Sequence, residues 1–146
     1  MVCAQIKQDS LLDLASPDSE LQFQDNFYEA LKQKGIENYT KAIDALITCT
    51  ELYPERAVVF YELGDLYFKT KAYSLAEINL QKAIVLDENN FWYKEKLYQL
   101  YVHKEDYNKA IAAVKPLLFK RQAYQEDLLH LNVSAGHYET ALRQIE

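Results

Sequence analysis

The stretch Phe60-Tyr61-Glu62-Leu63-Gly64-Asp65-Leu66-Tyr67, followed shortly by Tyr73-Ser74-Leu75-Ala76, decides the fold of this 146-residue chain. The Tyr-x-x-Ala fragment occurs in four successive segments, which begin at Tyr39, Tyr73, Tyr107 and Tyr138. The alanines of these fragments, at 42, 76, 110 and 141, are separated by 34, 34 and 31 residues. A fixed period of this length indicates an internal structural repeat.

Each fragment lies between two helical patterns. Apolar residues at i, i+3, i+4 and i+7 precede it, most clearly over 60–67, and a second apolar period follows it, as in Ala76, Leu80 and Ala83. A short polar turn, such as Thr70-Lys71-Ala72, separates the two helices. The unit is therefore helix, tight turn, helix. Because one such hairpin cannot bury its apolar face alone, neighbouring hairpins must stack.

These residues resemble the tetratricopeptide repeat family, whose pattern has a Leu-Gly-x-x-Tyr first helix and an Ala that begins the second. Residues 57–90 match best, through Phe60, Leu63, Gly64, Tyr67 and Ala76. The resemblance places the repeats at about 23–56, 57–90 and 91–124, with an incomplete one over 122–146. It implies an all-α fold: a right-handed superhelical stack of antiparallel helix pairs with about seven to eight helices.

The ends of the repeats give further expectations. Residues 1–15 are expected to be a loosely ordered segment and residues 16–146 to be the repeat domain, with Ser16-Pro17 starting the first helix. The second helix that begins at Tyr107 is expected to run to about Lys120. Its counterpart from Tyr138 has few residues left, so Leu142 and Ile145 would lack a neighbour. We therefore expect this chain to belong to a longer protein, or its open end to pair with another copy.

Composition excludes several classes of function. A formal charge of −6 argues against a nucleic-acid partner and against tight docking on an anionic membrane. No run of about eighteen apolar residues exists, so no transmembrane segment is predicted. The three His are scattered without a matching Asp or Cys, and no Gly-rich phosphate loop occurs. We expect no catalytic residues, no metal and no cofactor; a helical-repeat hydrolase is the most remote of the alternatives.

The family resemblance implies a concave groove lined by the first helix of each repeat, and it nominates binding residues by their positions in the repeat. These are Phe27, Leu31, Tyr61, Asp65, Phe68, Trp92, Glu95 and Gln99. Such a groove would be aromatic with acidic spots, and would suit an extended peptide that carries apolar side chains and a Lys or Arg. The alternative is that Phe27, Tyr61 and Trp92 are ordinary core, since a 3.6-residue stripe does not distinguish core from groove.

Two functions from different classes remain open. The first is a non-catalytic scaffold that binds a protein or an extended peptide. The second is a structural or self-assembly module whose groove binds nothing and whose open end, near Leu142 and Ile145, packs on the rest of the chain or another copy.

The N-terminal residues bear on where the protein works. Small residues at Val2 and Ala4 before Gln5 resemble the end of a signal peptide, and Cys3 could instead be a lipidated first residue. The chain is expected to be exported to the periplasm or cell envelope, with a cytoplasmic location as the alternative.

Overall fold

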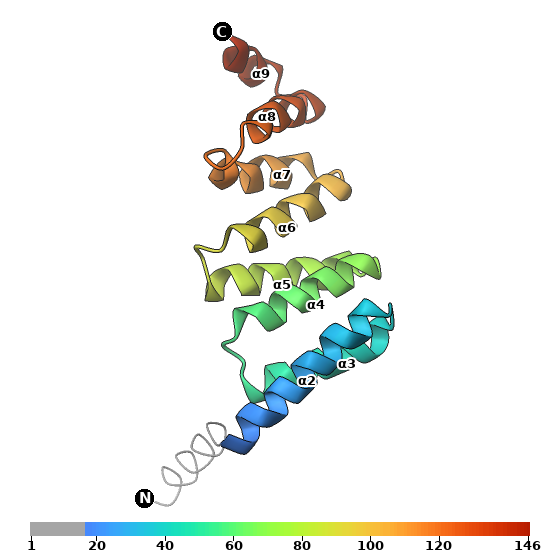
Figure 1. Ribbon diagram of the computed structural model, residues 1–146. Helices are drawn as coiled ribbons and strands as arrows, with labels where there is room; N and C mark the ends of the chain where they lie inside the picture. Colours follow the sequence, from blue (N-terminus) through green and yellow to red (C-terminus); the bar gives the residue numbers. More distant parts are fainter. Residues whose placement is uncertain (1–16) are drawn as a thin grey trace, which may run out of the picture.

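The computed structural model describes residues 17–146, so the expectations about residues 1–16, including the Ser16 cap and Cys3, lie outside the described residues. Within residues 17–146, eight α-helices stack one above another from α2 at the N-terminal end to α9 at the C-terminal end (Figure 1). The predicted all-α stack of antiparallel helix pairs is confirmed. The helices are α2 (Pro17–Gly35), α3 (Tyr39–Leu52), α4 (Ala57–Lys69), α5 (Tyr73–Leu86), α6 (Phe91–His103), α7 (Tyr107–Val114), α8 (Ala123–Ser134) and α9 (Tyr138–Ile145), with a 3-10 turn η1 (Lys115–Leu117) after α7.

The tight turns within the four helix pairs share one geometry, and all lie along the same edge of the stack in Figure 1. In each turn the residue two before the Tyr of the Tyr-x-x-Ala fragment has a positive φ: Glu37, Lys71, Glu105 and Gly136. The backbone N–H of the following residue bonds back to the preceding helix, as Ala72 N does to Tyr67 O at 2.8 Å. This is a Schellman ending. The repeated sequence period therefore corresponds to a repeated backbone turn.

Small residues let the two helices of a pair approach closely. A Cβ built on Gly64 in α4 would lie 2.6 Å from Leu80 Cγ and 3.3 Å from Leu80 N in α5. The Ala at the start of each second helix is buried too, from Ala42 to Ala110. Leu80 itself is fully buried, as are its repeat equivalents Leu46 and Val114. The apolar core forms three clusters along the stack, which the half-buried Tyr61, Tyr67 and Leu97 bridge.

The second helix of the third pair ends earlier than expected. We expected it to reach about Lys120, but α7 ends at Val114 and a 3-10 turn follows. Pro116 explains the difference, because proline has no N–H to bond the preceding turn and its ring clashes with the carbonyl four residues back. Residues 118–122 consequently leave the helical path that α5 follows in the preceding pair.

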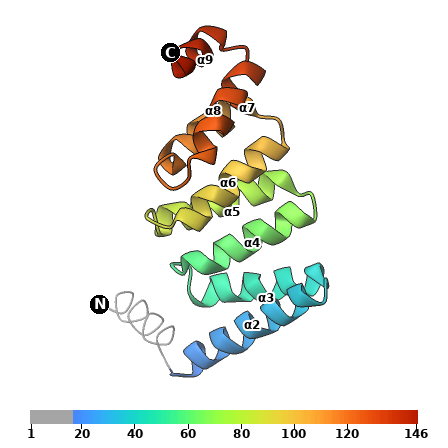
Figure 2. The same ribbon diagram turned by 45° about the horizontal axis from the view of Figure 1, so that its top comes forward.

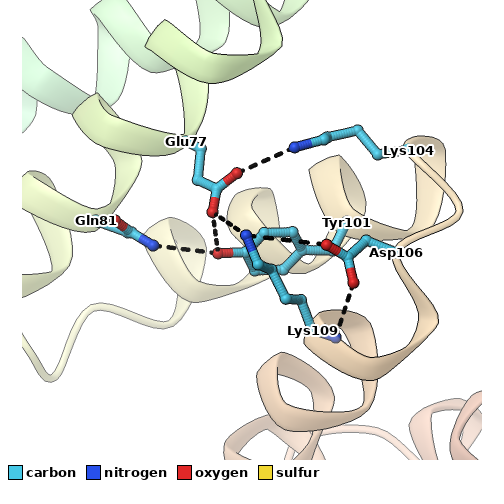
Figure 3. A network of polar contacts seen from close by, with 6 residues as sticks. All are labelled: Glu77, Gln81, Tyr101, Lys104, Asp106 and Lys109. Atoms are coloured by element: carbon cyan, nitrogen blue, oxygen red, sulfur yellow. Dashed lines mark hydrogen bonds and ion pairs between the residues drawn. The ribbon is translucent and has the colours of Figure 1, made fainter.

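Successive pairs are joined by polar contacts as well as by apolar packing. In Figure 3 the carboxylate of Glu77 in α5 accepts a hydrogen bond from Tyr101 Oη in α6, at 3.1 Å. The same carboxylate pairs with Lys104 at 3.1 Å and with Lys109 in α7 at 2.7 Å. Although burial alone would raise the pKa of Glu77, these contacts lower it below its usual value. Glu77 therefore ties the second pair to the third.

The tyrosines of the Tyr-x-x-Ala fragments are packing residues in three of the four pairs. Tyr39, Tyr73 and Tyr107 are half-buried against the core. Tyr138 is exposed instead. The ring of Tyr73 packs on His103 of the following pair. Tyr138 has no such partner, since no pair follows α9 among the described residues.

Candidate functional site

The first helices of three successive pairs surround a shallow hollow of about 470 Å³. It is lined by Phe68 of α4, by Tyr98, Gln99, Val102 and His103 of α6, and by Asp127 of α8. Figure 2 shows these helices in succession along the stack. Two residues of the sequence prediction, Phe68 and Gln99, thus contribute to one hollow.

Aromatic packing fixes one wall of this hollow. The Phe68 ring lies 5.3 Å from the His103 ring and 6.1 Å from the Tyr73 ring, centroid to centroid. Tyr73 Oη and His103 Nε2 are 2.9 Å apart and share a hydrogen bond. Since Tyr73 belongs to α5, the second helix of one pair holds an imidazole of the next pair in place. The wall is therefore preorganised, with Val102 exposed beside it.

Asp65 lies in the same row of first helices, but its carboxylate is buried among lysines. It pairs with Lys34 of α2 at 2.8 Å, with Lys96 of α6 at 2.9 Å and with Lys69 at 3.4 Å. Burial alone would raise the pKa of Asp65, but the hydrogen bonds from Lys34 and Lys96 outweigh it and hold that pKa at about 2. The carboxylate is 5% exposed and its charge is already compensated.

The carboxylate of Glu95 is also paired with groups of this chain. Its Oε1 accepts a hydrogen bond from the hydroxyl of Tyr124 in α8 and lies 3.3 Å from Arg121 Nη1. Burial, together with this hydrogen bond, raises the pKa of Tyr124 to about 12. We expected Asp65 and Glu95 to give the groove acidic spots. Because each carboxylate has its cation or donor within the chain, neither is presented to a ligand.

The aromatic residues nominated from the sequence divide into two groups. Phe27 stacks on Phe23 at 5.8 Å, and Tyr61 stacks on Tyr93 at 4.9 Å, so both pack within the helix stack and are half-buried. Trp92 is 60% exposed, and Leu31 is exposed as well. The hollow at Phe68 does not include these four residues.

Tyr98 and Asp127 were missed by the sequence prediction, and their hydroxyl and carboxylate form a hydrogen bond of 2.9 Å between α6 and α8. Burial is the main cause that raises the pKa of Tyr98, with Asp127 adding to it. A sequence signal for Tyr98 existed, since it occupies the repeat position filled by Ala30 and Gly64 in the first two pairs. A large polar aromatic side chain at a small-residue position indicates a local change of packing.

In the described chain, no group of three or more His, Cys, Asp or Glu side chains is placed to hold a metal ion. None of the helices described over 17–146 is long and apolar enough to cross a membrane.

Comparison with known proteins identifies one repeat of the chain and its fold. Residues 57–90 match the tetratricopeptide repeat model. No curated protein sequence matches the chain. Solved structures do, over most of its length. MamA is 20% identical with a TM-score of 0.72, over 84% of this chain and 69% of that chain. YrrB, described as a TPR protein with an unusual peptide-binding site, is 17% identical with a TM-score of 0.69, over 82% and 63%. The first TPR of Spaghetti (RPAP3), bound to the HSP90 peptide SRMEEVD, is 14% identical with a TM-score of 0.68, over 80% and 97%. Residues 57–90 are therefore a tetratricopeptide repeat, and the helical stack around them has the fold of the solved tetratricopeptide-repeat structures.

Proposed function

We propose that this chain is a non-catalytic scaffold that binds an extended peptide along its first helices. The observation that carries the proposal is the hollow lined by Phe68, Gln99, Val102 and His103, which combines an apolar wall with polar groups. Structural neighbours that are described with bound peptides or a peptide-binding site support it, namely YrrB and the RPAP3 repeat domain.

The side chains that line the hollow indicate the kind of peptide that it would bind. Phe68 and Val102 offer apolar surface to one side chain, and Gln99 and His103 offer hydrogen-bonding groups to the peptide backbone. Asp65 and Glu95 have internal partners, whereas the carboxylate of Asp127 lines the hollow beside Tyr98 and can pair with a Lys or Arg of the ligand. The proposed ligand is therefore an extended segment with a bulky apolar side chain and a neighbouring Lys or Arg.

A selection from a displayed library of random peptides tests the proposal. Peptides selected on the wild-type chain should bind it, and their binding should be lost on Val102→Asp, which places a charge in the hollow. The matched control is Ile78→Asp, at an exposed position of α5 that does not line the hollow. Equal binding of the selected peptides to both variants would show that they do not use the hollow.

Self-assembly through α9 is the second candidate, and one observation favours it. Leu142 and Ile145 are 58% and 69% exposed, whereas the repeat equivalents of Ile145, namely Leu46, Leu80 and Val114, are buried. If this face joins copies, sedimentation should give a concentration-dependent mass that Ile145→Glu reduces to that of the monomer. A single monomeric mass for the wild type at high concentration would exclude it. Export to the periplasm or cell envelope stays a prediction from residues 2–5.

A further inference from the structure

A second hollow, of about 430 Å³, lies at the other end of α6 from the hollow at Phe68. It is lined by Asn89, Phe91, Lys94, Pro116, Leu117, Phe119 and Lys120. Phe91 and Val102 are separated by about 16 Å along the axis of α6, taking about 1.5 Å per residue. Its lining residues belong to the α5–α6 and α7–α8 connections and to the start of α6, and Figure 1 shows these connections along the edge of the stack opposite the tight turns. It is distinct from the proposed groove and has no residue in common with it.

The hollow owes its shape to the early end of α7. Pro116 stops the helix, and the segment that follows brings Phe119 and Lys120 to the hollow's rim. Leu117, which is buried, contributes to its lining. The first two pairs carry no proline at this repeat position, where Thr48 and Lys82 stand, and their second helices continue to Leu52 and Leu86. The hollow is thus a feature of the third pair.

The charged groups that line this hollow are all positive. Lys94 and Lys120 are lining residues, and none of the lining residues is acidic. Within residues 17–146, none of the carboxylates lies within ion-pair distance of either lysine. In the first two pairs the repeat position of Lys94 holds Asn26 and Phe60. An uncompensated positive site in a chain of net charge −6 points to an anionic ligand.

The hollow also leaves apolar surface exposed. Phe119 is 78% exposed, an unusual position for a large aromatic ring. The ammonium group of Lys120 lies 5.3 Å from the centroid of the Phe119 ring and 5.7 Å from that of the Phe91 ring. A lysine held over aromatic rings is partly ordered before any ligand arrives. A ligand that covers Phe119 while it neutralises Lys120 would gain from both contacts.

We propose that this hollow is a second binding site, for an acidic peptide segment that carries a bulky apolar side chain. The apolar side chain packs against Phe119, Phe91 and Leu117. Neighbouring carboxylates of the ligand pair with Lys94 and Lys120. The site is independent of the groove at Phe68, so its existence does not depend on the function proposed for that groove.

A labelled synthetic peptide in which glutamate alternates with phenylalanine is a suitable first ligand, with binding to the intact chain measured by fluorescence anisotropy. Binding should be saturable, and Lys120→Glu and Phe119→Ser should each weaken it about tenfold or more, as for central interface residues. Both residues are exposed, so both variants should keep the wild-type thermal unfolding. Lys41→Glu, the same charge change at an exposed site on α3, is the matched control and should leave binding unchanged.

Three results would overturn the proposal. The first is equal loss of binding in Lys41→Glu and Lys120→Glu, which would show a response to overall charge only. The second is binding of the same peptide with lysine in place of glutamate. The third is binding of a single-stranded oligonucleotide in place of the acidic peptide, with loss in Lys120→Glu, since that would make the site a nucleic-acid site. Val102→Asp should not affect this peptide, which separates the site from the groove.

Discussion

Replacing Gly64 by Ala tests the claim that small residues set the distance between the helices of a pair. The added Cβ would lie 2.6 Å and 2.8 Å from two side-chain carbons of Leu80, and 3.3 Å from its backbone nitrogen. Carbon atoms in contact normally lie about 3.5–4.0 Å apart, so Leu80 would have to move by about 1 Å. Because Leu80 is fully buried, it has little room to do so.

The expected change in the free energy of unfolding on Gly64→Ala is a balance of two terms. Overpacking a well-packed site costs about 1–3 kcal/mol. Alanine in place of glycine inside a helix recovers about 1 kcal/mol. The net loss in the free energy of unfolding should be about 1 kcal/mol, which corresponds to a fall of about 4 °C in Tm for a chain of this size.

Urea denaturation of four proteins separates these terms: wild type, Gly64→Ala, Leu80→Ala and the double variant. In the Leu80→Ala background the clash is gone, so Gly64→Ala should become stabilising by about 1 kcal/mol. Gly35→Ala is the matched control, because a Cβ at Gly35 meets no atom within 4 Å and should not destabilise the chain. If Gly64→Ala stabilises the wild type as much as the Leu80→Ala variant, the close-approach argument is wrong.

Three further predictions concern single residues. Asp65→Asn should lower the free energy of unfolding by about 2 kcal/mol at neutral pH. Because the pKa of Asp65 in the folded chain is lowered to about 2, this stabilisation is present above pH 4 and should vanish as the pH falls toward 2. If urea titrations show that Asp65→Asn lowers the free energy of unfolding equally at neutral pH and near pH 2, the prediction is wrong. Lys71→Gly should stabilise the chain by about 0.5 kcal/mol, since Lys71 has a φ of 63° that glycine adopts without strain; a lower Tm would refute this. Burial raises the pKa of Cys49 to about 11, so iodoacetamide should modify Cys49 at pH 8 only as fast as the chain unfolds, and rapid labelling of folded protein in peptide mapping would count against its burial.

The architecture was predictable from the sequence because it depends on a short repeated pattern. Tyr39, Tyr73 and Tyr107 begin the second helices of the first three pairs, where the spacing predicted them. The early end of α7 could also be predicted from the sequence, because Pro116 follows it closely and proline rarely continues a helix. The apolar period nevertheless predicted a longer helix, because Ala110, Val114 and Leu117 continue it past Pro116.

The site was less predictable because it depends on contacts between different helices. Lys34, Asp65 and Lys96 come from three first helices, and nothing in their spacing shows that one carboxylate meets both lysines. A residue's position in the repeat indicates the face of the helix on which it lies. Whether its charge is compensated depends on long side chains of the neighbouring pairs, which vary from repeat to repeat.

The central claim is that a peptide binds along the first helices at Phe68. Backbone amide chemical shifts of the ¹⁵N-labelled chain, recorded during titration with a peptide selected on the wild type, test it most directly. Shifts should concentrate at Phe68, Gln99, Val102 and His103, with little change at Leu75 and Ile78 of α5. Shifts confined to α5, or spread evenly with no cluster on α4 and α6, would contradict the claim.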